Sequence, residues 1–216
     1  MDLFAILLLV IAANLDNLGV GISLRIRRIR VPFSSNLLIA FTTSSGTLLT
    51  LIAGKWLASF ISPELAKYTG ALVIIATGVW VLYEELCRAG RKAAAVNPAE
   101  AEYEQPPPET AGQRRLTELL TAPSLADVDH SGHIDLKEAL LLGMALALNN
   151  FAAGLGAGVF GLNPLLTAFT VSLFSLFLLW LGIGLGQNCM SRWLGDCAGP
   201  VAGLLLVLLG FFGIII

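Results

Sequence analysis

The feature that most constrains this chain is its set of long apolar runs. Hydrophobic residues make up 56% of the 216 residues and charged residues only 13%, too few charges for the surface of a soluble domain. Because backbone groups in lipid must hydrogen-bond within their own segment, such runs are expected to be helices. The sequence therefore predicts an all-α integral membrane protein with six transmembrane helices, each able to cross a hydrocarbon core of roughly 30 Å. The six spans are residues 3–24, 37–54, 68–86, 139–160, 165–186 and 198–216.

Basic residues indicate the orientation of these spans. If the six spans alternate, Lys55 and Lys67 lie on one side of the membrane and the rest of the 13 Lys and Arg residues on the other, beginning with "RIRRIR" at 25–30. Basic residues near spans remain in the cytoplasm. We therefore expect both termini outside. The three cysteines then lie near the cytoplasmic face without a CxxC motif, which argues against a thiol-redox protein.

The chain divides into two similar halves. A segment rich in Ala, Glu and Pro predicts a largely disordered cytoplasmic linker, 87–126, between a first three-helix repeat, 1–86, and a second, 139–216. "ANLDNLGVG" (13–21) resembles "LALNNFAAG" (146–154), and "AFTTS" (40–44) resembles "AFTVS" (168–172). Because each repeat has an odd number of spans, the second must enter the membrane from the opposite side. The sequence predicts two inverted repeats with a substrate site between them, near the midplane.

Polar residues inside the spans predict the transport site. A carboxylate in lipid tends to mark an ion or proton path, and Asp16 lies well inside the first span. Its expected neighbours are the amides Asn14, Asn17, Asn149 and Asn150 and the hydroxyls Thr43, Ser44, Ser172 and Ser175. This oxygen-rich set suits Mn²⁺, Mg²⁺ or Ca²⁺ and does not suit copper. The alternative for the amides and hydroxyls is interhelical hydrogen bonding. Glycines follow the polar groups of spans one and four, and they fit either local unwinding or close helix packing.

Residues 127–138, "DVDHSGHIDLKE", match the twelve-residue EF-hand loop. The ligand positions hold Asp127, Asp129, Ser131, His133 through its carbonyl, Asp135 and Glu138, and Gly132 occupies the sixth position, where a sharp turn is needed. We expect Ca²⁺ or a similar cation here, with span four as the exiting helix. The alternative is an acidic cap on that helix, with Asp135 at its start.

"NLDNLGVGISLRIRRIRVP" and "ADVDHSGHIDLKEALLLGMALALNN" resemble the YtaF-like sporulation membrane proteins. That branch is related to the MntP-type manganese efflux pumps and, more distantly, to the LysE-type exporters. The resemblance implies six spans, inverted repeats and the bacterial plasma (inner) membrane. It also implies that the pumps carry a second Asp in span four, where this chain has Asn149.

Together these features predict a secondary exporter of a divalent cation, with manganese as the candidate substrate and Asp16 as the anionic, proton-exchanging ligand. The alternative is a non-transporting, calcium-responsive membrane scaffold active in sporulation. An enzyme is not expected, because no second Asp accompanies Asp16 in a span and neither histidine lies in one. The expected partners are lipid and divalent cations, with no nucleic acid; the sequence leaves the oligomeric state open, a homodimer among the alternatives.

Overall fold

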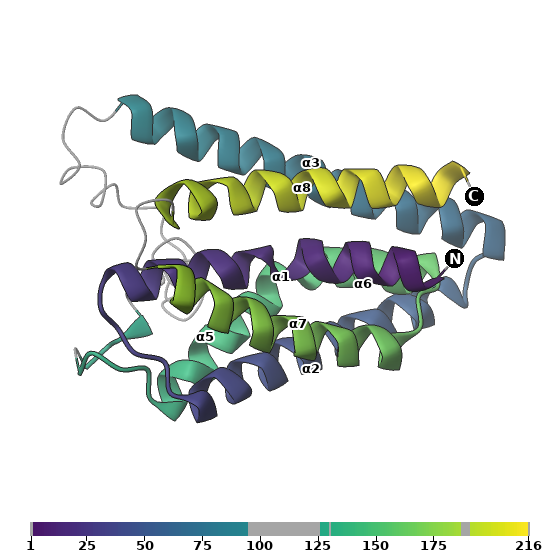
Figure 1. Cartoon of the computed structure of the whole chain (residues 1–216). Coiled ribbons are helices and arrows are strands. Elements are labelled where there is room, and N and C mark those ends of the chain that lie inside the picture. The colour runs from purple at the N-terminus through teal and green to yellow at the C-terminus, as the bar shows by residue number, and fades with distance from the viewer. Residues whose placement is uncertain (1, 95–125, 130, 187–190, 216) are drawn as a thin grey trace, which may run out of the picture.

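The computed structural model describes residues 2–94, 126–129, 131–186 and 191–215, and its regular secondary structure is helical (Figure 1). The helices are α1 (Asp2–Ile26), α2 (Phe33–Ala58), α3 (Pro63–Ala94), α5 (Leu136–Asn149), α6 (Phe151–Phe160), α7 (Pro164–Leu185) and α8 (Ser191–Ile215). Residues 95–125, which hold most of the predicted linker, lie outside the described residues. The helix α3 continues past residue 86, where the predicted span ends.

Five helices are long and apolar enough to cross a membrane. The pair α5 and α6, bent by 51°, passes the same test together; counted as one broken span, it brings the number of candidate spans to the six predicted. The chain is therefore a multi-pass membrane protein. Figure 1 places both termini at the same end of the bundle, as an even number of spans requires.

Helix contacts define how the bundle is built. The helix α1 packs against α7 and α8. In the broken span, α5 packs against α2, and α6 packs against both α2 and α3. Two further pairs, α2 with α7 and α3 with α8, complete the bundle. In Figure 1, α3 and α8 run side by side along one edge.

Glycines permit the closest of these contacts. A Cβ on Gly21 of α1 would lie 2.5 Å from the Leu179 carbonyl oxygen of α7, and one on Gly182 would meet α1 in turn. Gly54 of α2 and Gly158 of α6 face each other's backbones in the same way. In the first span, the interpretation of its glycines as a break is wrong, because α1 is continuous to Ile26 and Gly21 serves close packing.

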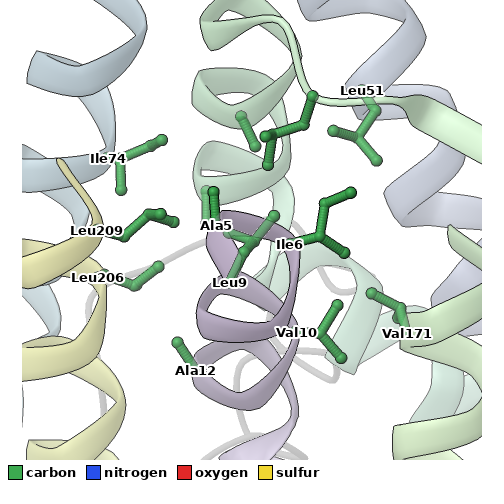
Figure 2. Packing of buried hydrophobic residues seen from close by; sticks show 13 residues of the cluster. Ala5, Ile6, Leu9, Val10, Ala12, Leu51, Ile74, Val171, Leu206 and Leu209 are labelled. Carbon is green, nitrogen blue, oxygen red and sulfur yellow. The ribbon is translucent and has the colours of Figure 1, made fainter. Parts of the chain in front are cut away.

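Two apolar clusters fill the interior at different depths. The termini-side cluster draws on all six spans around the first half of α1 (Figure 2); its members are Ala5, Ile6, Leu9, Val10, Ala12, Leu51, Ile74, Ala153, Ala157, Leu162, Val171, Leu206 and Leu209. The loop-side cluster comprises Val20, Leu24, Ile29, Ile39, Ala126, Ile134, Ala139, Leu142, Ala145, Leu146 and Leu179. Its described members come from α1, α2, α5, α7 and the adjoining loops. Residues 13–19 of α1 separate the two clusters.

Candidate functional site: a cation site at the break in span four

Two buried asparagines occupy the stretch of α1 between the apolar clusters. Asn14 donates from Nδ2 to the Val10 carbonyl oxygen at 2.8 Å. Asn17, one turn further on, donates from Nδ2 to Asn14 Oδ1 at 3.0 Å and to Ser175 Oγ of α7 at 2.8 Å. Both asparagines are fully buried, and Asn17 Oδ1 has no hydrogen-bond partner. An unsatisfied buried oxygen of this kind is costly unless a ligand supplies a positive partner.

The opposite wall is the break between α5 and α6. Asn150 lies at the break with φ −86° and ψ 1°, and its Nδ2 donates to the Ala13 carbonyl oxygen of α1 at 2.8 Å. Asn149, the last residue of α5, donates from Nδ2 to Asp16 Oδ2 at 3.1 Å. The other carboxylate oxygen, Asp16 Oδ1, accepts from the Asn17 backbone N–H at 2.7 Å. Asp16 therefore contacts Asn149, whereas Asn150 bonds the backbone of α1 at Ala13 and not the carboxyl group.

The residues of this site differ in burial. The Asp16 side chain is half-buried and Asn149 is exposed, whereas Asn14, Asn17 and Asn150 are buried. A charged group at this depth between packed helices is costly without a compensating partner. Asn149 supplies a neutral hydrogen bond and no positive charge to the Asp16 carboxyl group.

The predicted hydroxyl ligands are held mainly by their own helix. Thr43 Oγ1 donates to the Ile39 carbonyl oxygen at 2.9 Å, with a second, 3.5 Å contact to that of Gly143 in α5. Ser44 Oγ donates to Phe41 at 3.0 Å, and Ser172 is half-buried. Most of these bonds lie within α2, and the contact between Thr43 and Gly143 joins two helices, as the interhelical alternative expects. Ser175 is the hydroxyl that directly contacts an asparagine of the site.

The loop 127–138 folds as a compact acidic turn. Carboxylate oxygens of Asp127, Asp129 and Glu138 lie within 4.8 Å of one another. Gly132 has φ +78°, which explains the glycine at the sixth position. Backbone N–H groups face the carboxylates: Ser131 N donates to Asp127 Oδ1 at 2.9 Å and to Asp129 Oδ1 at 3.0 Å, and Gly132 N donates to Asp127 Oδ2 at 3.0 Å.

The remaining predicted loop ligands have other roles in this structure. Asp135 caps α5: its Oδ1 accepts from Glu138 N at 2.8 Å, and Glu138 Oε2 accepts from Asp135 N at 3.0 Å, a reciprocal capping box. Ser131 Oγ donates to the His133 carbonyl oxygen at 3.0 Å. Contacts with the Ser131 side chain and backbone N–H hold the pKa of the exposed Asp129 carboxyl below its ordinary value, because they favour the ionised form.

The acidic loop is attached to the connection between α1 and α2. Arg30 N donates to the Gly132 carbonyl oxygen at 2.9 Å, and Ile134 N donates back to Arg30 at 2.8 Å, which forms a short β-bridge. Ser35 Oγ of α2 donates to the Ile134 carbonyl oxygen at 2.7 Å, and the Ile134 side chain is fully buried in the loop-side cluster. The loop thus contacts both helices that lead to the site from this end.

Sequence reasoning missed Asn36, which lies in the first turn of α2 and is 5% exposed. Its Nδ2 donates to the Leu176 carbonyl oxygen of α7 at 3.2 Å, and its Oδ1 has no hydrogen-bond partner. A polar residue near the end of a predicted span is expected to be solvated, so nothing in the sequence indicates that this asparagine is buried.

The comparisons with known proteins agree with this architecture. A protein of Bacillus subtilis (strain 168) named "Probable sporulation protein YtaF" is 30% identical over 213 residues, which are 98% of this chain and 99% of that protein. The family described as "Mntp: Putative manganese efflux pump" matches residues 120–214.

Shorter matches link the chain to named pumps. Proteins named "Putative manganese efflux pump MntP" from Bacillus licheniformis and Geobacillus kaustophilus are 36% and 31% identical over 67 and 71 residues. These matches cover 31% and 33% of this chain and 36% and 38% of the pumps. No solved structure matches the chain.

Proposed function

Because the chain belongs to the YtaF-like family of membrane proteins, which is related to the manganese efflux pumps, we propose that it exports a divalent metal cation, with manganese as the first candidate. One observation carries the proposal. Asp16 of α1 faces Asn149 at a break in the opposing span, 3.1 Å between Oδ2 and Nδ2, and the next residue, Asn17, has an unpartnered Oδ1. Carboxylate and amide oxygens are the ligands that hard and borderline divalent cations prefer.

To bind the cation, side chains of the site would replace hydrogen bonds that they make in this structure with bonds to the ion. Asp16 offers a carboxylate, Asn17 its free amide oxygen, and Asn149 and Ser175 can turn an oxygen towards the ion after releasing a hydrogen bond. Asn14 and Asn150 fix the surrounding backbone through Val10 and Ala13. A break in a helix leaves backbone carbonyl groups free to complete such a site.

Proton exchange would occur at Asp16. A single carboxylate leaves a divalent cation with excess positive charge, so the site gains by releasing any proton when the ion enters. The same group can take a proton when the ion leaves on the outside. Export would then be coupled to the proton gradient, with Asp16 alternating between ion and proton.

The two halves would move as inverted repeats around this site. The packing pattern supports the idea, because exchanging α1 with the broken span, α2 with α7 and α3 with α8 reproduces the main helix contacts. The mutual glycine contacts follow the same exchange: the pair Gly21 and Gly182 corresponds to the pair Gly158 and Gly54, and each pair joins the two halves. Both termini would lie outside and the Arg-rich α1–α2 connection inside.

The acidic loop would act as a cytoplasmic cation sensor for the transport site. The carboxylate oxygens of Asp127, Asp129 and Glu138 lie within 4.8 Å of one another, which supports binding of Ca²⁺ or Mn²⁺ there, and Glu138 belongs to the first turn of α5. An ion that draws Glu138 inward would tilt α5, which ends at Asn149. We expect that Asp127→Ala with Glu138→Ala abolishes any calcium dependence of efflux. Retention of that dependence in the double variant would exclude the sensor role.

The test of transport is uptake of ⁵⁴Mn²⁺ into inside-out vesicles, with a panel of other divalent cations in parallel. Asp16→Asn should abolish ⁵⁴Mn²⁺ uptake, because the variant keeps the size of the side chain but has no charge. Asn163→Asp is a matched control, since Asn163 caps α7 at the far end of the helix and Asp is an equally good cap. Equal uptake by wild type and Asp16→Asn would favour the alternative, a sporulation scaffold that does not transport.

A further inference from the structure

Two buried amide oxygens in the described part of the chain have no hydrogen-bond partner, Asn17 Oδ1 and Asn36 Oδ1. They belong to different helices, yet both amides are anchored on consecutive residues of α7: Asn17 on the Ser175 hydroxyl and Asn36 on the Leu176 carbonyl. Consecutive residues of a helix rise by only about 1.5 Å. The two amides therefore reach α7 within one turn of each other.

The orientation of the Asn36 amide follows from its anchor. Its Nδ2 donates to the Leu176 carbonyl oxygen at 3.2 Å, and rotating the amide by 180° would place Oδ1 against that oxygen instead. The unpartnered atom is therefore the oxygen. With 5% of the residue exposed, bulk water does not solvate this atom freely. A buried oxygen aimed at no donor is suited to a cation, which accepts several oxygens at once.

Asn36 lies on the side of the site that is nearer to the acidic loop. It lies in the first turn of α2, next to Ser35, which bonds the acidic loop through Ile134. Asp16 and Asn17 lie deeper along α1, between the two apolar clusters. A cation that enters from the end of the α1–α2 connection would pass Asn36, whose partner Leu176 adjoins the Ser175 partner of Asn17, on its way to Asp16.

We propose that Asn36 is a cation ligand of the transport pathway: its Oδ1 holds the incoming divalent ion where α2 meets α7 and passes it to Asp16 and Asn17. This proposal rests on the export function. It adds a neutral oxygen from α2 to a site whose other ligands come from α1, α5 and α7. Asn36 would raise the affinity for the ion without adding a second charge.

The experiment is equilibrium binding of Mn²⁺ to the full chain in nanodiscs, measured from the loss of the free Mn²⁺ electron paramagnetic resonance signal. The Mn²⁺ binding that is lost in Asp16→Asn is the Asp16-dependent component. Binding that persists in this variant occurs at other sites, among them the acidic loop. Asn36→Asp should tighten the Asp16-dependent component by roughly tenfold or more, because it adds a negative charge beside the ion. Asn36→Leu should weaken it by roughly tenfold. Asn163→Asp, which adds the same charge at the other end of the bundle, should leave it unchanged.

Thermal melting of each variant in the absence of metal shows whether it has folded. If Asn36→Asp and Asn36→Leu melt like wild type and bind Mn²⁺ with unchanged affinity, the oxygen of Asn36 is satisfied by water and the proposal is overturned, while export at Asp16 stands. If wild type itself has no Asp16-dependent binding, both the export function and the role of Asn36 are overturned. If only one Asn36 variant folds, its own shift in affinity decides the question.

Discussion

Restoring the second carboxylate is the most direct test of the charge at the site. Asn149 is the residue of the broken span that faces Asp16, at 3.1 Å between Nδ2 and Oδ2. Asn149→Asp keeps the shape of the side chain and replaces the donor with an acceptor that carries a charge. In the ion-free protein two carboxylate oxygens would then lie where a hydrogen bond now holds Asp16 and Asn149 together.

The size of the effect follows from that distance. Two unit charges about 3.1 Å apart repel by about 5 kcal/mol at an effective dielectric constant of about 20. At about 1.4 kcal/mol per tenfold, this is enough to keep the pair sharing one proton near pH 7. A divalent cation removes the repulsion, so its binding must release that proton. For each unit of pH, the apparent Mn²⁺ affinity of the variant should therefore increase by up to about tenfold more than that of wild type.

The assay is Mn²⁺ binding in nanodiscs at pH 6, 7 and 8, with Asn149→Ser as an uncharged control and Asp16→Asn/Asn149→Asp as a charge swap. The swap retains one carboxylate, now on the opposite wall, and should bind Mn²⁺ with the same pH dependence as wild type. Equal pH slopes for wild type and Asn149→Asp would refute the reasoning, because the two side chains would then not share one site.

Two further predictions concern packing and the loop. Gly21→Ala places a Cβ 2.5 Å from the Leu179 carbonyl oxygen and should lower stability by about 1–3 kcal/mol relative to Gly184→Ala, a helix position with open space, in thermal melting. Equal midpoints would contradict the contact. Ser35→Ala removes the buried 2.7 Å bond to Ile134 and should weaken loop docking by about 1–3 kcal/mol, seen as faster hydrogen exchange of the loop; Ser59→Ala, which loses an exposed local bond, should not alter that exchange.

Much of the architecture could be predicted from local sequence. The apolar runs predicted the helices, because a bilayer leaves the backbone few alternatives. The pairing of Asp16 with Asn149 followed from a short internal similarity, and the glycine in the acidic loop from the turn it must make. These features depend on residues close together in the chain or on a repeated pattern.

The remainder depends on contacts between distant segments. Span four is interrupted at Asn150, ahead of its glycines, because the amide of Asn150 bonds the Ala13 carbonyl of another helix. Asn36 looks like an ordinary residue at the end of a span until α7 is placed against it. Likewise, nothing in "RIRRIR" indicates that Arg30 forms a β-bridge with a loop about a hundred positions later.

The termini-side cluster has a consequence for how the molecule can open towards that end. Since all six spans contribute to it around Ile6 and Leu9, no single helix can swing aside and leave the others sealed. Hydrating each Leu or Ile side chain there costs about 1.5–3 kcal/mol. If the chain exports cations as proposed, release at this end requires several helices to move together, because the main helix contacts all join the first half of the chain to the second.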